Sequence, residues 1–314
     1  MQVRNLGTSG LRVSLAGLGC NNFGGRIDLE ASRKVVHRAL DLGITLFDTA
    51  DMYGNRGGSE DCLGAILGHR RKDIVLATKF GWEMDDAGVL KGASRRYIMS
   101  AVEASLKRLR TDWIDLYQLH KPDPLTPIEE TLDALDDLVR QGKVRYIGCS
   151  NLPAWQVTDA HWTARSRGTA AFVSCQDEYS LLVRGIEREL IPAMGAHGLG
   201  LLPYFPLACG LLSGKYKRNA PMPEGARLTN TPRFAETYMT EANWQKVEAL
   251  TSLAAKRGCT LLEIAMAWLA TQPRTASVIA GATKPEQVEQ NVRAVEFALT
   301  ADDRAEIDRL TKPS

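Results

Sequence analysis

Four residues at the ends of three successive apolar runs have side chains suited to a proton transfer. The run ITLF is followed by Asp48, Tyr53 comes five residues later in FDTADMYG, and the next two runs end at Lys79 and His120. A free tyrosine has a pKa of about 10, which a nearby lysine lowers, while a carboxylate keeps that lysine charged. Imidazole can bond the oxygen that is protonated. The set predicts that Tyr53 is a general acid toward an oxygen gaining negative charge, such as a carbonyl that receives hydride.

Each of these residues alone is more often structural, so a shared chemical role depends on whether the fold brings them together. Eight apolar, β-rich runs alternate with amphipathic helical segments such as 31–42, 97–109, 128–139 and 285–297. Continuous apolar runs are typical of parallel strands covered on both faces. Repeated strand–helix units of this number favour an α/β fold, a (β/α)8 TIM barrel, in which the carboxyl ends of all strands meet at one rim. The expected strands are 13–19, 45–50, 73–80, 113–120, 144–150, 171–178, 200–205 and 276–282.

The remaining segments add to this barrel without suggesting a second domain, so we expect one domain over residues 1–314. RNLGTSGLRV predicts an N-terminal β-hairpin turning at Ser9–Gly10, residues 210–241 a long loop, and residues 301–310 an extra C-terminal helix. Ser94 and Thr126 are expected N-caps, with Pro127 at the first helical position; Gly43 and Gly142 suit helix ends. The alternative, a doubly wound dinucleotide domain, is disfavoured because GLGCNNFGG lacks the GxGxxG spacing.

Composition excludes several classes of function. The 314 residues carry a formal net charge of +2, which gives no nucleic-acid or membrane-surface signature. No run approaches the length of a membrane span, and the N-terminus has no signal-peptide pattern. The five histidines form no HxH motif, which argues against a metal-dependent hydrolase. A cytoplasmic protein without disulfides or metal is expected, because the cysteines are widely spaced: Cys20, Cys62, Cys149, Cys175, Cys209 and Cys259.

Four motifs give the chain a more specific resemblance. FDTADMYG, ATKFGW, LYQLHKPDP and IGCSN resemble signatures of the aldo-keto reductases, and the similarity runs from RNLGTSGLRVS to GATKPEQVEQNV. The resemblance implies the (β/α)8 barrel and NAD(P)H-dependent reduction of carbonyls. It also implies that Asp48, Tyr53, Lys79 and His120 are the catalytic tetrad, with Tyr53 as the general acid.

Other expected strand ends carry groups suited to a nicotinamide. Ser150, Asn151 and Gln176 can bond a carboxamide, and Tyr204 can stack on the ring. The resemblance assigns them these roles, and it places Lys215 and Arg227 over or beside the phosphates. GLLSGK is too short for a P-loop. Relatives often have serine at the position of Phe205. The long loop of residues 210–241 suits a flap that closes over the cofactor. Further cofactor contacts expected from the resemblance are Cys20, Asn21, Asp48, Phe205, Pro206, Leu207, Ala208 and Gly210.

The segment GATKPEQVEQNV opens a helix whose N-terminus can attract phosphate. The family binds the adenosine 2′-phosphate and adenine here, and many relatives have arginine at Gln287 and glutamate at Gln290. Lys284 is expected to restore the missing charge, so we predict NADPH as the cofactor, with NADH also possible. The contacts that this resemblance implies are Gly281, Ala282, Thr283, Gln287, Gln290 and Asn291.

The substrate is less well defined by the sequence. Phe23, Met52 and Trp82 are expected to form an apolar wall near Tyr53 and Asn22 a polar edge, for a small aldehyde or α-dicarbonyl. The oligomeric state is not predicted. A second interpretation is a regulatory, cofactor-binding module like the potassium-channel β subunits, which QDEYSLLVRGIE and LACGLLSGKY resemble. Those subunits have asparagine at the position of His120, which favours catalysis here.

Overall fold

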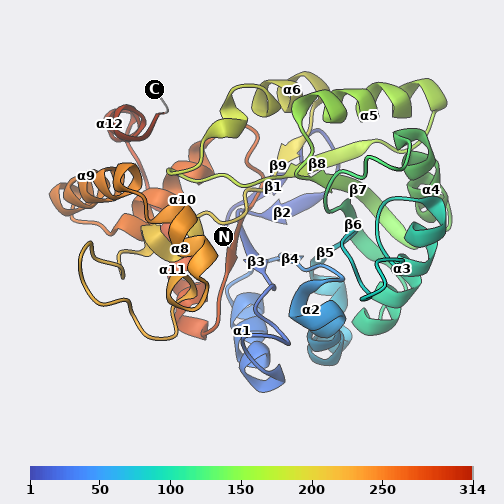
Figure 1. Cartoon of the computed structure of the whole chain (residues 1–314), viewed down its shortest axis with the longest axis horizontal. Coiled ribbons are helices and arrows are strands. Elements are labelled where there is room, and N and C mark those ends of the chain that lie inside the picture. Colours follow the sequence, from blue (N-terminus) through green and yellow to red (C-terminus); the bar gives the residue numbers. More distant parts are fainter. Residues whose placement is uncertain (313–314) are drawn as a thin grey trace.

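The computed structural model describes residues 1–312, in which eight parallel strands form the barrel (Figure 1). Their spatial order is β10–β3–β4–β5–β6–β7–β8–β9. Backbone bonds from Leu201 N to Arg274 O (2.7 Å) and from Ala276 N to Leu201 O (2.9 Å) link β9 to the segment before β10. The predicted TIM barrel is confirmed. The strands are β3 (Ala16–Gly19), β4 (Leu46–Asp48), β5 (Val75–Phe80), β6 (Ile114–Leu119), β7 (Val144–Ser150), β8 (Phe172–Gln176), β9 (Gly200–Leu201) and β10 (Val278–Gly281).

Helices surround the strands, and several of them present an apolar stripe to the sheet. In α4, for example, Leu132, Leu135 and Leu138 recur every three residues and are fully buried. The helices are α1 (Leu29–Asp41), α2 (Tyr53–Leu67), α3 (Arg95–Leu109), α4 (Ile128–Arg140), α5 (Ala154–Arg167), α6 (Leu190–His197), α7 (Arg227–Asn230), α8 (Pro232–Tyr238), α9 (Glu241–Arg257), α10 (Leu261–Thr271), α11 (Pro285–Val295) and α12 (Ala301–Thr311).

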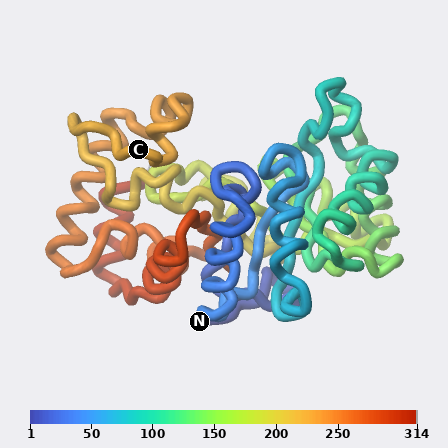
Figure 2. The backbone as a smooth tube through the Cα atoms, turned by 90° about the horizontal axis from the view of Figure 1, so that it is seen from below, coloured from blue at the N-terminus to red at the C-terminus, as the bar shows by residue number. Residues whose placement is uncertain are grey.

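The predicted N-terminal hairpin is confirmed: β1 (Val3–Asn5) pairs with β2 (Arg12–Ser14), and it covers the N-terminal end of the barrel. Leu6 and Val13 from the hairpin pack with Leu46, Ala77 and Leu116 in a small cluster that is separate from the larger strand–helix core. Figure 2 shows the N-terminus at one end of the molecule and the segment around residues 210–240, in gold and orange, toward the other. The hairpin therefore closes the end opposite the site.

The two-residue period of the strands determines which side chains reach the interior. In β4, Leu46 belongs to the inner cluster and Phe47 to the outer core, so Asp48 points inward again. The same alternation in β5 and β6 gives Ala77 and Leu116 inward positions, followed two residues later by Lys79 and Gln118. Three neighbouring strands thus end with polar side chains directed into the barrel.

Two expectations about local structure are wrong. Residues 210–241 are not one loop, because they contain α7, α8 and the end of a 3₁₀ helix (Ala208–Ser213). Thr126 does not cap α4: its hydroxyl donates to Asp123 Oδ2 at 2.8 Å, and Pro127 occupies the N-cap position without a side-chain bond. The cap at Ser94 and the C-terminal helix are confirmed. Among the described residues, no helix is long and apolar enough to cross a membrane.

Candidate active site

A buried ion pair lies at the base of the candidate site. Lys79 Nζ is 2.7 Å from Asp48 Oδ2, donates to Thr49 O at 2.8 Å, and lies 3.5 Å from the Tyr53 hydroxyl. The other carboxylate oxygen of Asp48 accepts from Gln176 Nε2 at 2.7 Å and Gln118 Nε2 at 3.3 Å. Two of the three ammonium hydrogens are therefore taken by Asp48 and Thr49, and the third is available to the phenol.

The electrostatics of this pair differ from the sequence prediction in one respect. Burial raises the pKa of Tyr53, and the Lys79 cation only partly opposes this, so the net pKa lies above the usual 10 and not below it. Burial lowers the pKa of Lys79, but Asp48 and Tyr53 outweigh it, so the pKa of Lys79 is raised. At neutral pH the phenol therefore keeps its proton beside a charged lysine, which is the starting state of a general acid.

His120 follows β6 and stands beside the phenol. Its ring centroid is 5.7 Å from that of Tyr53 and 6.0 Å from that of Trp82, in edge-on geometry in both cases. Burial, reinforced by the cations Lys79 and Lys121, lowers the pKa of His120 well below 6.5. The imidazole is neutral at pH 7, so it can donate one hydrogen bond to a substrate oxygen without adding a charge.

An unusual turn follows Tyr53 at the start of α2. Gly54, Asn55 and Arg56 all have left-handed backbone angles, with φ values of 67°, 61° and 65°. A Cβ at Gly54 would overlap the carbonyl oxygen of Phe23, so only glycine fits there. The turn begins directly after Tyr53, whose hydroxyl lies 3.5 Å from Lys79 Nζ.

The site opens into a cavity of about 870 Å³. Most predicted site residues line it, but Phe23, Lys79, Ala208 and Ala282 do not. Lys79 lies beneath the cavity floor. Phe23 is fully buried in the core, so it does not form the expected substrate wall. The predicted residues that line the cavity are Cys20, Asn21, Asn22, Asp48, Met52, Tyr53, Trp82, His120, Ser150, Asn151, Gln176, Tyr204, Phe205, Pro206, Leu207, Gly210, Lys215, Arg227, Gly281, Thr283, Gln287, Gln290 and Asn291.

The side chains expected to hold a nicotinamide form one bonded group. Tyr204 OH donates to Asn151 Oδ1 at 2.8 Å, and Asn151 Nδ2 donates to His120 O at 3.0 Å. Ser150 Oγ donates to Gln176 O at 2.7 Å across the β7–β8 pair. An amide, a hydroxyl and a flat aromatic ring therefore lie together beside Tyr53 and His120, which fits a planar ring bearing a carboxamide.

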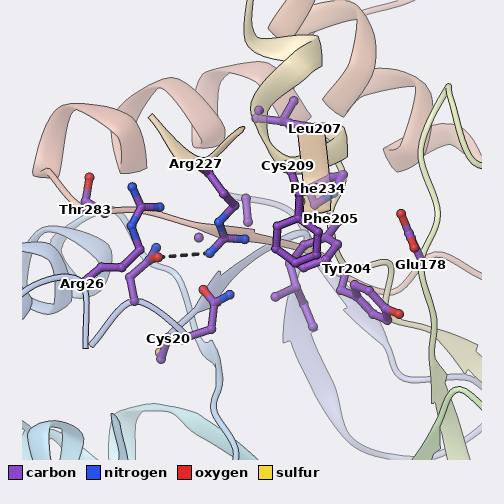
Figure 3. Close-up of a pocket in the computed structure, with 18 of the residues that line it drawn as sticks. Cys20, Arg26, Glu178, Tyr204, Phe205, Leu207, Cys209, Arg227, Phe234 and Thr283 are labelled. Carbon is purple, nitrogen blue, oxygen red and sulfur yellow. Dashed lines mark hydrogen bonds between the residues drawn. The ribbon is translucent and has the colours of Figure 1, made fainter. Parts of the chain in front are cut away.

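The opposite part of the cavity is cationic. Figure 3 shows Arg26 and Arg227 directed into one space near Thr283. Burial and Arg227 lower the pKa of Arg26; burial, Arg26 and Arg227 lower that of Lys215. These cations thus repel one another, and among residues 1–312 none has a carboxylate at ion-pair distance. Such a group fits a polyphosphate, which would remove the repulsion.

Residues 214–240 form a segment that we call the strap. Arg26 and Arg227 connect the strap to the rim of the barrel. Arg26 Nη2 donates to Gly225 O at 2.9 Å, and Arg227 Nη2 donates to Asn22 Oδ1 at 3.2 Å. The Phe234 ring packs edge-on against Phe205, with centroids 5.8 Å apart. The strap therefore forms one wall of the cavity and is held by reciprocal contacts across it.

Sequence reasoning missed several lining residues and made one charge assignment that the structure does not support. Lys284 is exposed and does not line the cavity, and Gln287 bonds back to Thr283 N at 2.8 Å, so this wall is uncharged. The inward position of Gln118, which bonds Asp48, was readable from its two-residue spacing to His120. No such signal marked the cavity-lining residues of the strap and nearby loops: Arg26, Glu178, Cys209, Arg233, Phe234, Thr237 and Tyr238.

Comparison with known proteins agrees with this geometry. Residues 16–312 match the model of the aldo/keto reductase family. A probable voltage-gated potassium channel subunit beta of Arabidopsis thaliana is 37% identical over 303 residues, covering 94% of this chain and 92% of the relative. A probable subunit of the same name from Oryza sativa is also 37% identical, with the same coverage. A putative one from Schizosaccharomyces pombe is 36% identical over 324 residues, covering 98% of this chain and 89% of the relative. The chain therefore belongs to the aldo/keto reductase family.

Proposed function

We propose that the chain is an NADPH-dependent oxidoreductase, acting in the cytoplasm, that reduces aldehyde or ketone carbonyls to alcohols. Family membership supports an oxidoreductase function. The observation that carries the finer proposal is the Tyr53 hydroxyl, 3.5 Å from a buried, charged Lys79, at one end of a cavity whose other end is cationic. The two ends match the acid that carbonyl reduction needs and the phosphates of a dinucleotide.

The roles of the residues follow from their charges. The nicotinamide, when bound, supplies the hydride. Tyr53 donates its proton to the carbonyl oxygen as that oxygen gains negative charge, and Lys79 stabilises the phenolate left behind. Asp48 keeps Lys79 charged and is itself held by Gln118 and Gln176. Neutral His120 donates a hydrogen bond that orients the same oxygen.

The α11 wall, where the family is expected to bind the 2′-phosphate, is neutral, and the cations lie at the part of the cavity suited to the pyrophosphate, which NADPH and NADH share. Each charge-assisted hydrogen bond to a phosphate contributes about 1.5–3 kcal/mol, so Arg26, Lys215 and Arg227 can hold a polyphosphate firmly. Contacts of this kind support a dinucleotide of either type, so the preference rests on the family resemblance: we propose NADPH as the preferred cofactor, with NADH also accepted. Comparable kcat/KM values for the two would contradict that preference.

The test uses the wild-type protein. NADPH fluorescence should be quenched or shifted on titration with the protein, and NADPH oxidation should then be measured with a panel of small aldehydes, ketones and α-dicarbonyls. We expect saturable binding and turnover of at least one carbonyl class. Absence of NADPH binding would refute the proposal.

A second candidate function comes from the relatives, whose names describe channel subunits. In that case the chain would bind the dinucleotide and serve mainly as a partner of another protein. The neutral His120 beside Tyr53 favours catalysis, since a partner role alone does not require an imidazole there. Tight NADPH binding with no turnover of any carbonyl in the panel would favour this second function.

A further inference from the structure

A buried carboxyl group that has no part in the proposed chemistry lies between Asp48 and Tyr53. Asp51 is only 1% exposed, and its Oδ2 accepts a hydrogen bond from the Tyr97 hydroxyl of α3 at 3.2 Å. Its Oδ1 has no partner among residues 1–312. Burying a carboxyl with so few bonds costs free energy, so its position calls for an explanation beyond packing.

The backbone around Asp51 shows what the Tyr97 bond fixes. Thr49 N donates to Ala77 O at 2.9 Å and Asp51 N to Lys79 O at 3.1 Å, so the chain still follows β5 up to residue 51. Beyond it, the chain leaves the sheet, and the left-handed turn follows directly after Tyr53. Asp51 is therefore the last residue tied to the sheet before the phenol, and its side chain ties that point to α3.

The distance between the phenol and the lysine makes this point of attachment important. The Tyr53 hydroxyl lies 3.5 Å from Lys79 Nζ, at the outer limit of a hydrogen bond. A displacement of the Asp51–Tyr53 segment by a fraction of an ångström would weaken that contact. Misplacement by about 1 Å can cost roughly 10²-fold in rate.

We propose that Asp51 and Tyr97 are positioning residues, whose hydrogen bond sets the distance between the Tyr53 phenol and Lys79. This inference rests on the proposed function for its kinetic consequence, but not for its structural one. Both residues are buried and neither lines the cavity, so they act through Tyr53 and not on a ligand.

A neighbouring tyrosine provides a matched control. Tyr117 of β6 is also fully buried and lies within electrostatic range of Asp51, but its hydroxyl has no hydrogen-bond partner among the described residues. Tyr97→Phe and Tyr117→Phe thus remove the same atom from two buried phenols near one carboxyl. Only the first removes a bond. Asp51→Asn is the conservative variant, because the amide oxygen can still accept from Tyr97.

The experiment combines NMR of protein labelled with ¹³Cζ-tyrosine and steady-state kinetics with NADPH and a carbonyl. The Tyr53 resonance is assigned with Tyr53→Phe. Tyr97→Phe should shift the Tyr53 resonance and lower kcat roughly tenfold, with the Kd for NADPH unchanged. Tyr117→Phe and Asp51→Asn should leave the resonance in place and kcat within about twofold of the wild type.

Two results would overturn the inference. One is a Tyr53 resonance that is the same in Tyr97→Phe as in the wild type. The other is an equal shift in Tyr117→Phe, which would assign the effect to general packing around Asp51. If the wild type reduces no carbonyl, the proposed function fails, while the resonance still tests the positioning role.

Discussion

At the floor of the cavity the Lys79 ammonium is buried against Asp48 at 2.7 Å, whereas at the mouth the cations Arg26, Lys215 and Arg227 contact backbone, amide or aromatic groups and no carboxylate of residues 1–312. The floor is built from strand ends and is electrostatically complete without a ligand. The mouth is built from loops and the strap, and its charges repel one another. We infer that the groups proposed for proton transfer are in position before a ligand binds. The cationic region, in contrast, is completed by the phosphates of the dinucleotide.

The largest effect should come from removing the charge of Lys79 at the cavity floor. Lys79→Met leaves the Asp48 carboxylate buried without its counterion, which should lower the free energy of unfolding by about 3–5 kcal/mol. Loss of the charge that supports the phenol should lower kcat by about 10²–10⁴-fold. Urea denaturation and turnover at saturating NADPH measure the two effects. Adding Asp48→Asn should restore much of the stability without restoring turnover, and restored turnover would contradict the role of Lys79.

The same substitution at the mouth should act differently. Lys215→Met removes a repelled, exposed cation, so the free energy of unfolding should stay constant or increase slightly. The Kd for NADPH should rise by at least about tenfold, because one charge-assisted bond is lost. Fluorescence titration measures the Kd. If Lys215→Met destabilised the protein as strongly as Lys79→Met, the contrast between the two regions would be wrong.

A pH-dependent effect concerns Asp177, a buried carboxyl that directly follows Gln176 at the end of β8. Burial raises the pKa of Asp177 from 3.8 to about 7. The folded protein therefore keeps a proton that the unfolded chain has released, so stability falls as pH rises from about 4 to about 7, by at most about 1.4 kcal/mol per unit. Asp177→Asn does not titrate. The free energy of unfolding of Asp177→Asn, relative to that of the wild type, should increase from about pH 4 to about 7 and stay level above that range. A difference that does not change with pH would show that Asp177 is already ionised in the folded protein.

Ionic strength should affect the floor and the mouth differently, and this is the smallest of the expected effects. Raising ionic strength from about 0.05 M to about 0.5 M shortens the screening length severalfold and weakens exposed charge interactions far more than buried ones. The Kd for NADPH should rise several-fold, and kcat at saturation should change less than twofold. A fall in kcat that parallels the rise in Kd would mean that the floor is also open to ions.

The sequence predicted the barrel and the placement of the residues at the cavity floor because both depend on simple periods. Asp48, Lys79 and His120 follow apolar runs, and the strand period carries their side chains to one rim. The strap was predicted only as a loop, since its course depends on contacts such as Arg26 with Gly225, which are about two hundred residues apart. Phe23 was misplaced because side-chain direction in an irregular turn follows no period. The predicted direction of the Tyr53 pKa shift was wrong because the sequence does not show how deeply a phenol is buried.

The most direct test of the central claim is the turnover of Tyr53→Phe with NADPH and a reducible aldehyde, measured together with its Kd for NADPH. We expect kcat to fall by about 10²–10⁴-fold and the Kd to stay almost unchanged, because only the proton donor is lost. Wild-type turnover in Tyr53→Phe would contradict it.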